Sequence, residues 1–204
     1  LSSLGIAAFS VENIVWVVLL LVTLGIVCAW RSGMELGSLL RRYAILLVTS
    51  EGVFFVAFAF ALYLRWFNPD LWHPWFGGEK PMDFAILNAT LKSDFFPPHD
   101  PFLSGGYLNY YYFGFVLVST PLKLLGISPE LGYQFALATV FSISATCVFG
   151  VANALTGNLR NRIFPGVAAV ALVMFVGNLE TAKMLLGQIT GFLVTHEWPP
   201  ISAS

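Results

Sequence analysis

The sequence predicts an all-α membrane protein that crosses the bilayer several times, and two properties of the chain carry this prediction. Hydrophobic residues make up 57% of the 204 residues and charged residues only 10%, whereas soluble domains contain about 25% charged residues. The apolar residues are also concentrated in runs of about twenty, the length that crosses the hydrocarbon core of a bilayer. Each run is expected to be a helix, because lipid offers no hydrogen-bond partners for open backbone groups. Residues 1–204 are therefore expected to form one transmembrane domain in contact with the lipid bilayer.

About five transmembrane helices are expected along the chain. They are residues 11–30, 43–66, 108–127 and 131–155, and a fifth span that begins near Ile163. The fifth run is interrupted after residue 176 by the polar residues Asn178, Glu180, Thr181 and Lys183. It is either one long helix with a polar patch or a short span followed by a helix on the membrane surface.

The composition also excludes several functions. The net charge of −1 offers no basic surface for nucleic acid. Cys28 and Cys147 fall inside apolar runs, so we expect small buried hydrophobic residues rather than disulfide partners or metal ligands. The sequence has no cysteine and histidine spacing typical of a metal site, no phosphate-binding glycine loop and no nucleophile elbow.

Basic residues near the span ends predict the orientation in the cell membrane. The first loop, residues 31–42, carries three arginines and one acidic residue, so it is expected on the cytoplasmic side. The loop of residues 67–106 then lies on the outer side. Arg160 and Arg162 would also lie outside, against the rule, but the bias of the first loop is larger.

The outer loop, residues 67–106, is the predicted functional region. It holds five of the eleven acidic residues of the chain, and its proline, tryptophan and phenylalanine content argues against disorder. A short helix is expected from Lys80 or Pro81 towards Leu91. Its expected apolar face consists of Phe84, Ile86, Leu87 and Leu91. The triplet Asn88-Ala89-Thr90 in the same segment matches an N-glycosylation sequon.

Glu79 and Asp83 are the candidate catalytic residues. They are four residues apart, so a helix beginning near Lys80 brings both carboxylates to one face, close to the positive end of its dipole. Such a pair can divide into a general base and a metal ligand or orienting group, which leaves a divalent metal open as a cofactor. The alternative is that the two acids cap the helix and pair with Lys80.

Three further features of the sequence are candidates for a functional role. His99 and Asp100 lie among stiffening prolines and either bind a metal or move a proton, or form a solvated turn. The run Tyr110–Tyr112 either forms an interfacial belt or turns at least one hydroxyl inward towards a phosphate or sugar oxygen. Glu51 lies near the middle of the second span, where a carboxyl group usually faces protein or a cavity. We expect Asp83 to lie near Glu79 and the Tyr110–Tyr112 run.

These motifs, in this order, resemble the YYY membrane-protein family of Chloroflexi and archaea (DUF2298). The resemblance extends from about residue 40 to 155, with Phe102 and Phe115 where the family usually has Trp and often has His. The residues that carry it are Glu51, Phe67-Asn68-Pro69-Asp70, Gly78-Glu79-Lys80-Pro81-Met82-Asp83, Phe96-Pro97-Pro98, Asp100-Pro101, Gly105 and Asn109-Tyr110-Tyr111-Tyr112-Phe113-Gly114.

The resemblance implies a lipid-linked sugar transferase of the GT-C class. In that class an acidic residue of a large outer loop is the base that accepts the proton of the acceptor hydroxyl, and the sugar comes from a polyprenyl-phosphate donor. Carried onto this chain, Asp83 or Glu79 would be the base. Asp100 and His99, together with Asn109 and the Tyr110–Tyr112 run, would shape the donor or acceptor site.

Two interpretations of the whole chain follow. Family members are much longer, so the chain is either the N-terminal part of a glycosyltransferase-like enzyme or a shortened member. A shortened member would be a non-catalytic subunit among other membrane subunits, for example in a photosynthetic reaction-centre assembly of a phototrophic host. An open reading frame that continues well past Ser204 favours the enzyme.

Overall fold

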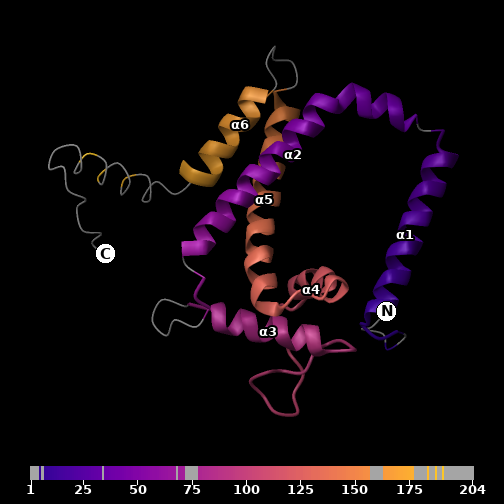
Figure 1. Ribbon diagram of the computed structural model, residues 1–204, viewed down its shortest axis with the longest axis vertical. Coiled ribbons are helices and arrows are strands. Elements are labelled where there is room, and N and C mark those ends of the chain that lie inside the picture. Colours follow the sequence, from indigo (N-terminus) through magenta and orange to yellow (C-terminus); the bar gives the residue numbers. More distant parts are fainter. Residues whose placement is uncertain are drawn as a thin grey trace. The chain divides into compact units, whose positions relative to one another are not determined.

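The computed structural model describes residues 5, 7–33, 35–67, 69–71, 78–156, 163–176, 183, 187 and 190, and this part of the chain is helical (Figure 1). Its elements are α1 (Val11–Arg31), α2 (Leu36–Phe67), α3 (Lys80–Lys92), α4 (Phe113–Leu125), α5 (Pro129–Leu155) and α6 (Ile163–Ala171), which continues as a π-helical turn (Leu172–Val176). The predicted all-α membrane fold is confirmed.

Three of these helices, α1, α2 and α5, are long and apolar enough to cross a membrane. Of the other two expected spans, α4 is shorter than predicted, with 13 residues, whereas α6 and its π-helical turn reach Val176, where the described part of this segment stops. At 1.5 Å per residue, 13 residues extend about 20 Å, less than the roughly 30 Å of a hydrocarbon core. Among the described residues three helices are thus long enough to cross a membrane, and α4 is shorter than the expected third span. The continuation of the fifth expected span lies outside the described residues.

Local backbone interactions explain the short α4. The expected span begins at residue 108, but the N–H of Leu108 donates to the Pro98 carbonyl at 2.8 Å, which holds this segment outside a helix. At the other end Gly126 takes a left-handed conformation with φ 64° and closes the helix on the Leu122 carbonyl. The second span is longer than predicted, since α2 begins at Leu36 rather than Tyr43. The expected loop 31–42 is thereby reduced to a few residues.

The contacts divide the chain into two units. Unit 1 comprises Leu1–Ala44 and Phe58–Val140, and unit 2 comprises Ile45–Ala57 and Phe141–Ser204. In unit 2, the buried residues Ser142, Ala145 and Phe149 recur on one face of α5. Gly166 of α6 lies so close to this helix that a Cβ atom there would stand 2.6 Å from the Phe149 ring. Small residues permit this close helix packing.

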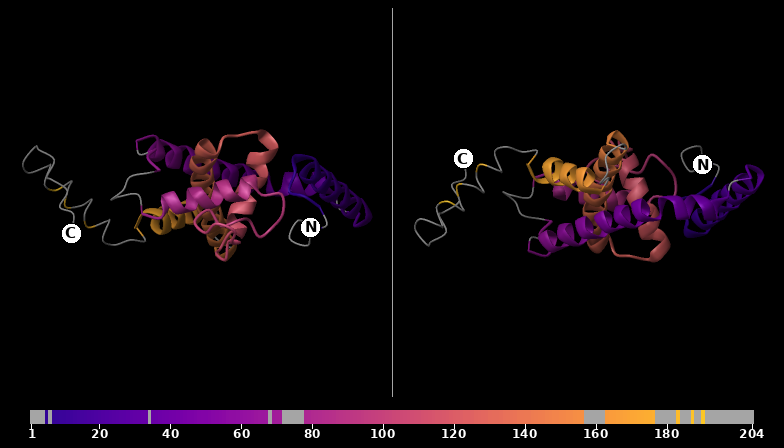
Figure 2. Two further views of the ribbon diagram at one scale, coloured as in Figure 1. Left: turned by 90° about the horizontal axis from the view of Figure 1, so that it is seen from below. Right: turned by 90° about the horizontal axis from the view of Figure 1, so that it is seen from above.

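In unit 1, α3 packs against α4 (Figures 1 and 2). Phe84 and Leu87 of α3 are buried against Leu122 of α4 and Tyr133 of α5. Ile86 is also buried, and Leu91 packs against the same cluster. The predicted start and apolar face of this helix are confirmed.

A second cluster connects the chain before α1 to the segment after α3. Phe9, Ile14 and Phe96 form its buried part, and the Phe9 N–H donates to the Asp94 carbonyl at 2.6 Å. The ammonium group of Lys123, on α4, lies 4.5 Å from the centre of the Phe9 ring. It donates to the Phe9 carbonyl and, at 3.4 Å, to the Ser93 carbonyl. One cation therefore joins three segments of unit 1.

Both cysteines differ from their prediction. Cys28 and Cys147 are free, as expected, but both are exposed rather than buried. They lie on α1 and α5, and only 6% and 22% of the most apolar windows of these helices are buried within the chain. An exposed thiol on a membrane-spanning helix is compatible with lipid, because a free cysteine behaves as a small hydrophobic residue.

Leu87→Ala should lower the free energy of unfolding by about 2–5 kcal/mol, since it opens a cavity beneath α3. The side chain of Leu87 is 1% exposed. The measurement is denaturant unfolding of the protein in lipid nanodiscs. Leu103→Ala is the matched control, because the side chain of Leu103 is 62% exposed and its removal should change stability by less than about 0.5 kcal/mol. Equal losses in the two variants would contradict the docking of α3.

Candidate functional site

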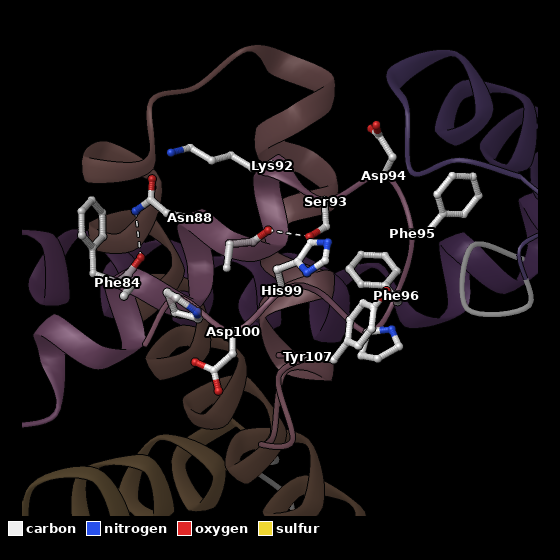
Figure 3. A pocket seen from close by; sticks show the side chains of 14 residues that line it. Phe84, Asn88, Lys92, Ser93, Asp94, Phe95, Phe96, His99, Asp100 and Tyr107 are labelled. Atoms are coloured by element: carbon white, nitrogen blue, oxygen red, sulfur yellow. Dashed lines mark hydrogen bonds between the residues drawn. The ribbon is translucent and has the colours of Figure 1, made fainter. Parts of the chain in front are cut away.

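A pocket of about 960 Å³ lies beside α3, in unit 1 (Figure 3). Its volume is at the upper end of the roughly 300–1,000 Å³ of ligand-binding pockets. Five residues of α3 form one wall, and they recur at helical spacing so that they share one face. They are Phe84, Ala85, Asn88, Ala89 and Lys92. We call this cavity the α3 pocket.

The chain after α3 forms the opposite wall of the α3 pocket. Residues 98–108 fold back on themselves: His99 pairs with Tyr107 in an antiparallel β-bridge, and the Asp100 N–H donates to the Gly106 carbonyl at 3.0 Å. The rings of His99 and Tyr107 are stacked, with their centres 4.9 Å apart. His99, Asp100 and Tyr107 all line the pocket, so the backbone pairing fixes an aromatic pair and a carboxylate on the same wall.

Asp100 stabilises its own turn as well as lining the α3 pocket. One of its carboxylate oxygens accepts a hydrogen bond from the Phe102 N–H at 2.8 Å, a turn that aspartate commonly forms. Asp100 is half-buried, whereas His99 is exposed. The two sequence interpretations of Asp100, a turn residue and a binding residue, are therefore compatible in one geometry.

The acid pair Glu79 and Asp83 lies at the N-terminus of α3. The Asp83 N–H donates to the Glu79 carbonyl at 2.9 Å, and Glu79 occupies the N-cap position without a side-chain capping bond. Partial burial raises the pKa of the Asp83 carboxyl, and the nearby Glu79 charge raises it further. A hydrogen bond from the Tyr133 hydroxyl, at 3.5 Å, acts in the opposite direction. The pKa of Asp83 is therefore shifted towards neutral pH relative to that of an ordinary aspartate.

Three residues that are connected to Asp83, directly or through one another, were not predicted from the sequence. Tyr133 is the tyrosine that contacts Asp83, and it comes from α5. Arg65, in the last turn of α2, interacts electrostatically with Tyr133, and its Nε donates to the Gln134 Oε1 at 2.5 Å. Gln134 in turn donates to the Pro69 carbonyl at 3.1 Å. Arg65 could have been recognised from the sequence as a candidate, because it is a lone cation at the end of an apolar span.

The structure separates the predicted site residues into two groups. Asn88 and Lys92 follow Asp83 by five and nine residues, which places them about 140° and 180° further around an α-helix. Asp83 is accordingly not among the residues that line the α3 pocket, whereas Asn88 and Lys92 are. The acid pair and the α3 pocket thus use different faces of one helix.

The Tyr110–Tyr112 run precedes α4 and is not helical. Tyr112 is half-buried and its ring stacks on Phe96, with centres 6.0 Å apart, so one tyrosine of the three does turn inward. Tyr110 and Tyr111 contact each other edge to face and are exposed, as is Asn109. None of these residues lines the α3 pocket. We expected the run beside Asp83, but the tyrosine that reaches this carboxylate is Tyr133.

Two further expectations concern residues away from both groups. Glu51 is exposed on α2, so the described chain does not cover this carboxyl group as we expected. The polar interruption at Asn178, Glu180 and Thr181, and the basic residues Arg160 and Arg162, lie outside the described residues. Within the described part, no group of three or more His, Cys, Asp or Glu side chains is placed to hold a metal. Glu79 and Asp83 would offer a divalent ion two carboxylates.

The titration of Asp83 should move in opposite directions in two variants. Glu79→Gln removes a neighbouring negative charge and should lower the pKa of Asp83. Tyr133→Phe removes the hydrogen bond to the carboxylate and should raise it. The measurement is carbon-13 NMR of carboxyl-labelled aspartate in nanodiscs, with the Asp83 signal assigned by its absence in Asp83→Asn. Shifts of the same sign in both variants would contradict the described contacts.

A family model described as uncharacterized membrane protein (DUF2298) matches residues 1–196, which extends the resemblance beyond residues 40–155. Comparison with curated proteins and with solved structures gives no significant match. Because the family match covers nearly the whole sequence, together with both groups of site residues, the chain belongs to the DUF2298 family of membrane proteins.

Proposed function

We propose that the chain is part of a membrane-embedded glycosyltransferase of the GT-C type, which transfers a sugar from a polyprenyl-phosphate donor on the outer side of the cell membrane. The observation that carries this proposal is the environment of Asp83. Its carboxyl group has a raised pKa, caused by partial burial and by Glu79, and contacts the Tyr133 hydroxyl. Perturbed carboxyl groups of this kind are characteristic of proton-transfer sites.

In the proposed reaction Asp83 accepts the proton of the acceptor hydroxyl. The hydroxyl oxygen forms a bond to the anomeric carbon of the donor sugar, and the bond from that carbon to the phosphate oxygen breaks. The polyprenyl phosphate leaves with the bonding electrons, and the proton remains on Asp83. A carboxylate with a raised pKa suits this step, because general base efficiency is greatest when the pKa approaches the operating pH.

The residues around Asp83 support an anionic donor. The donor phosphate gains charge as it leaves, and Arg65 supplies a permanent cation in the same group of side chains. Glu79 is exposed and available to orient the acceptor or to bind a divalent metal, should the reaction use one. Asp83 is partly buried, and its reduced contact with water strengthens these electrostatic effects.

Glu51 favours an alternative function. This exposed carboxyl group lies within a 31-residue apolar helix segment, and acidic residues at that depth usually face protein or a water-filled cavity. Further membrane helices would therefore cover α2. If they belong to other proteins, the chain is a non-catalytic subunit of a larger membrane complex.

Asp83→Asn should abolish sugar transfer by the full-length protein, since the amide keeps the shape of the side chain but cannot accept the proton. The assay follows radiolabelled sugar from a panel of polyprenyl-phosphate donors in native membranes. Asp100→Asn should reduce transfer less, because Asp100 lines the α3 pocket, whereas Asp83 lies on a different face of α3.

The controls separate the two functions. Unchanged thermal unfolding of Asp83→Asn excludes a folding defect as the cause of lost transfer. Full activity in this variant would rule out Asp83 as the base. No transfer by the wild-type protein with any donor of the panel, combined with co-purification of further membrane subunits, would favour the subunit function.

A further inference from the structure

We propose that the α3 pocket binds a neutral carbohydrate, as a second site that is separate from Asp83. This goes beyond the proposed transfer reaction, which needs only a donor and an acceptor hydroxyl beside the acid pair. Three properties of the pocket support it: its charge, its aromatic wall and its mixture of hydrogen-bond donors and acceptors. Together they define a ligand that is rich in hydroxyl groups and carries no negative charge.

The charge of the α3 pocket argues against an anionic ligand. One cation, Lys92, lies among its lining residues, against two carboxylates, Asp94 and Asp100. A phosphate or carboxylate ligand would therefore meet a net negative surface, and like charges at short range repel. Lys92 and Asp94 are both exposed, so solvent screens both charges, and the half-buried Asp100 is the least screened charge of the lining. The polyprenyl phosphate of the proposed donor is thus a poor ligand here.

The aromatic wall suits a sugar ring. His99 and Tyr107 are stacked nearly parallel, with 19° between their planes, and Phe84 and Phe96 line the same pocket. The faces of aromatic rings carry negative partial charge, whereas the C–H groups on a sugar face carry weak positive charge. A pyranose ring can therefore lie against this wall through its C–H face, which leaves its hydroxyl groups free for polar partners.

Polar partners of both kinds are present around the α3 pocket. The Asn88 side chain donates one N–H to the Phe84 carbonyl at 2.8 Å, and its amide has a second N–H and a carbonyl oxygen. Asp100 uses one carboxylate oxygen for its own turn and has a second oxygen to accept from a hydroxyl. Figure 3 shows that these two side chains come from the two walls, Asn88 from α3 and Asp100 from the folded-back segment. Because each sugar hydroxyl both donates and accepts, this pairing fits it.

The experiment measures binding of neutral trisaccharides to the full-length protein in nanodiscs without any donor lipid. Isothermal titration calorimetry compares maltotriose, mannotriose and chitotriose with inorganic phosphate. We expect at least one trisaccharide to bind and phosphate not to bind. Because no transfer takes place, a failure of the proposed transferase reaction leaves this result unaffected. Absence of binding by all three sugars, or preferential binding of phosphate, overturns the proposal.

The variants test the two walls. Tyr107→Ala and Asn88→Ala should each weaken trisaccharide binding at least tenfold, whereas Tyr107→Phe keeps the ring and should retain it. Tyr63→Ala is the matched control, because Tyr63 is 61% exposed on α2 and outside the pocket. Undiminished binding in Asn88→Ala, or equal loss in Tyr107→Ala and Tyr63→Ala, contradicts the assigned wall residues. A shift of the Asp83 NMR signal on addition of the sugar contradicts the separation of the two sites.

Discussion

The docking of α3 through Phe84 and Leu87 determines how the rest of the candidate site is arranged. A helix with one buried face has two remaining sides, and its sequence decides which residues occupy each. Burial against Leu122 and Tyr133 directs Asp83 towards α5 and leaves Asn88 and Lys92 to line the α3 pocket. The apolar contacts that hold α3 in place therefore also separate Asp83 from the α3 pocket.

Lys123 gives this arrangement a second point of attachment. Its hydrogen bonds to the Phe9 and Ser93 carbonyls connect the start of the chain, the end of α3 and α4 through one cation. The Phe9 and Phe96 rings pack at 5.1 Å between their centres beside it. Phe96 also lines the α3 pocket, so the same aromatic contact that secures the N-terminal segment supports the pocket wall.

Much of the fold could be predicted from the sequence, but less of the candidate site could, and particular residues show why. The start of α3 followed from Pro81 and the apolar spacing of Phe84, Ile86 and Leu87, which are local signals. Long apolar runs predicted α1, α2 and α5, but hydropathy alone could not show that Leu108 pairs with Pro98 and shortens α4. A non-local contact of this type has no signature in a single sequence.

The same limit applied to the site residues. The pairing of Glu79 with Asp83 was predictable, because four residues make one helical turn. The contact between Asp83 and Tyr133 joins residues 50 positions apart, and the Arg65 contact with Gln134 joins residues 69 apart. Asp100 and His99 were expected near the substrate, but the wall that they share with Tyr107 depends on the backbone pairing of His99 with Tyr107. These side chains are brought together by tertiary contacts, which the sequence of a single chain does not reveal.

The burial of Thr90 has a consequence for covalent modification of the chain. Asn88-Ala89-Thr90 matches an N-glycosylation sequon, yet the Thr90 side chain is 0% exposed and its hydroxyl donates to the Ile86 carbonyl at 2.8 Å. A modifying enzyme would have to read that hydroxyl, which the folded helix conceals. Attachment of a bulky glycan to Asn88 would therefore have to precede the docking of α3. The packing of one helical turn thus makes the sequon Asn88-Ala89-Thr90 inaccessible in the folded protein.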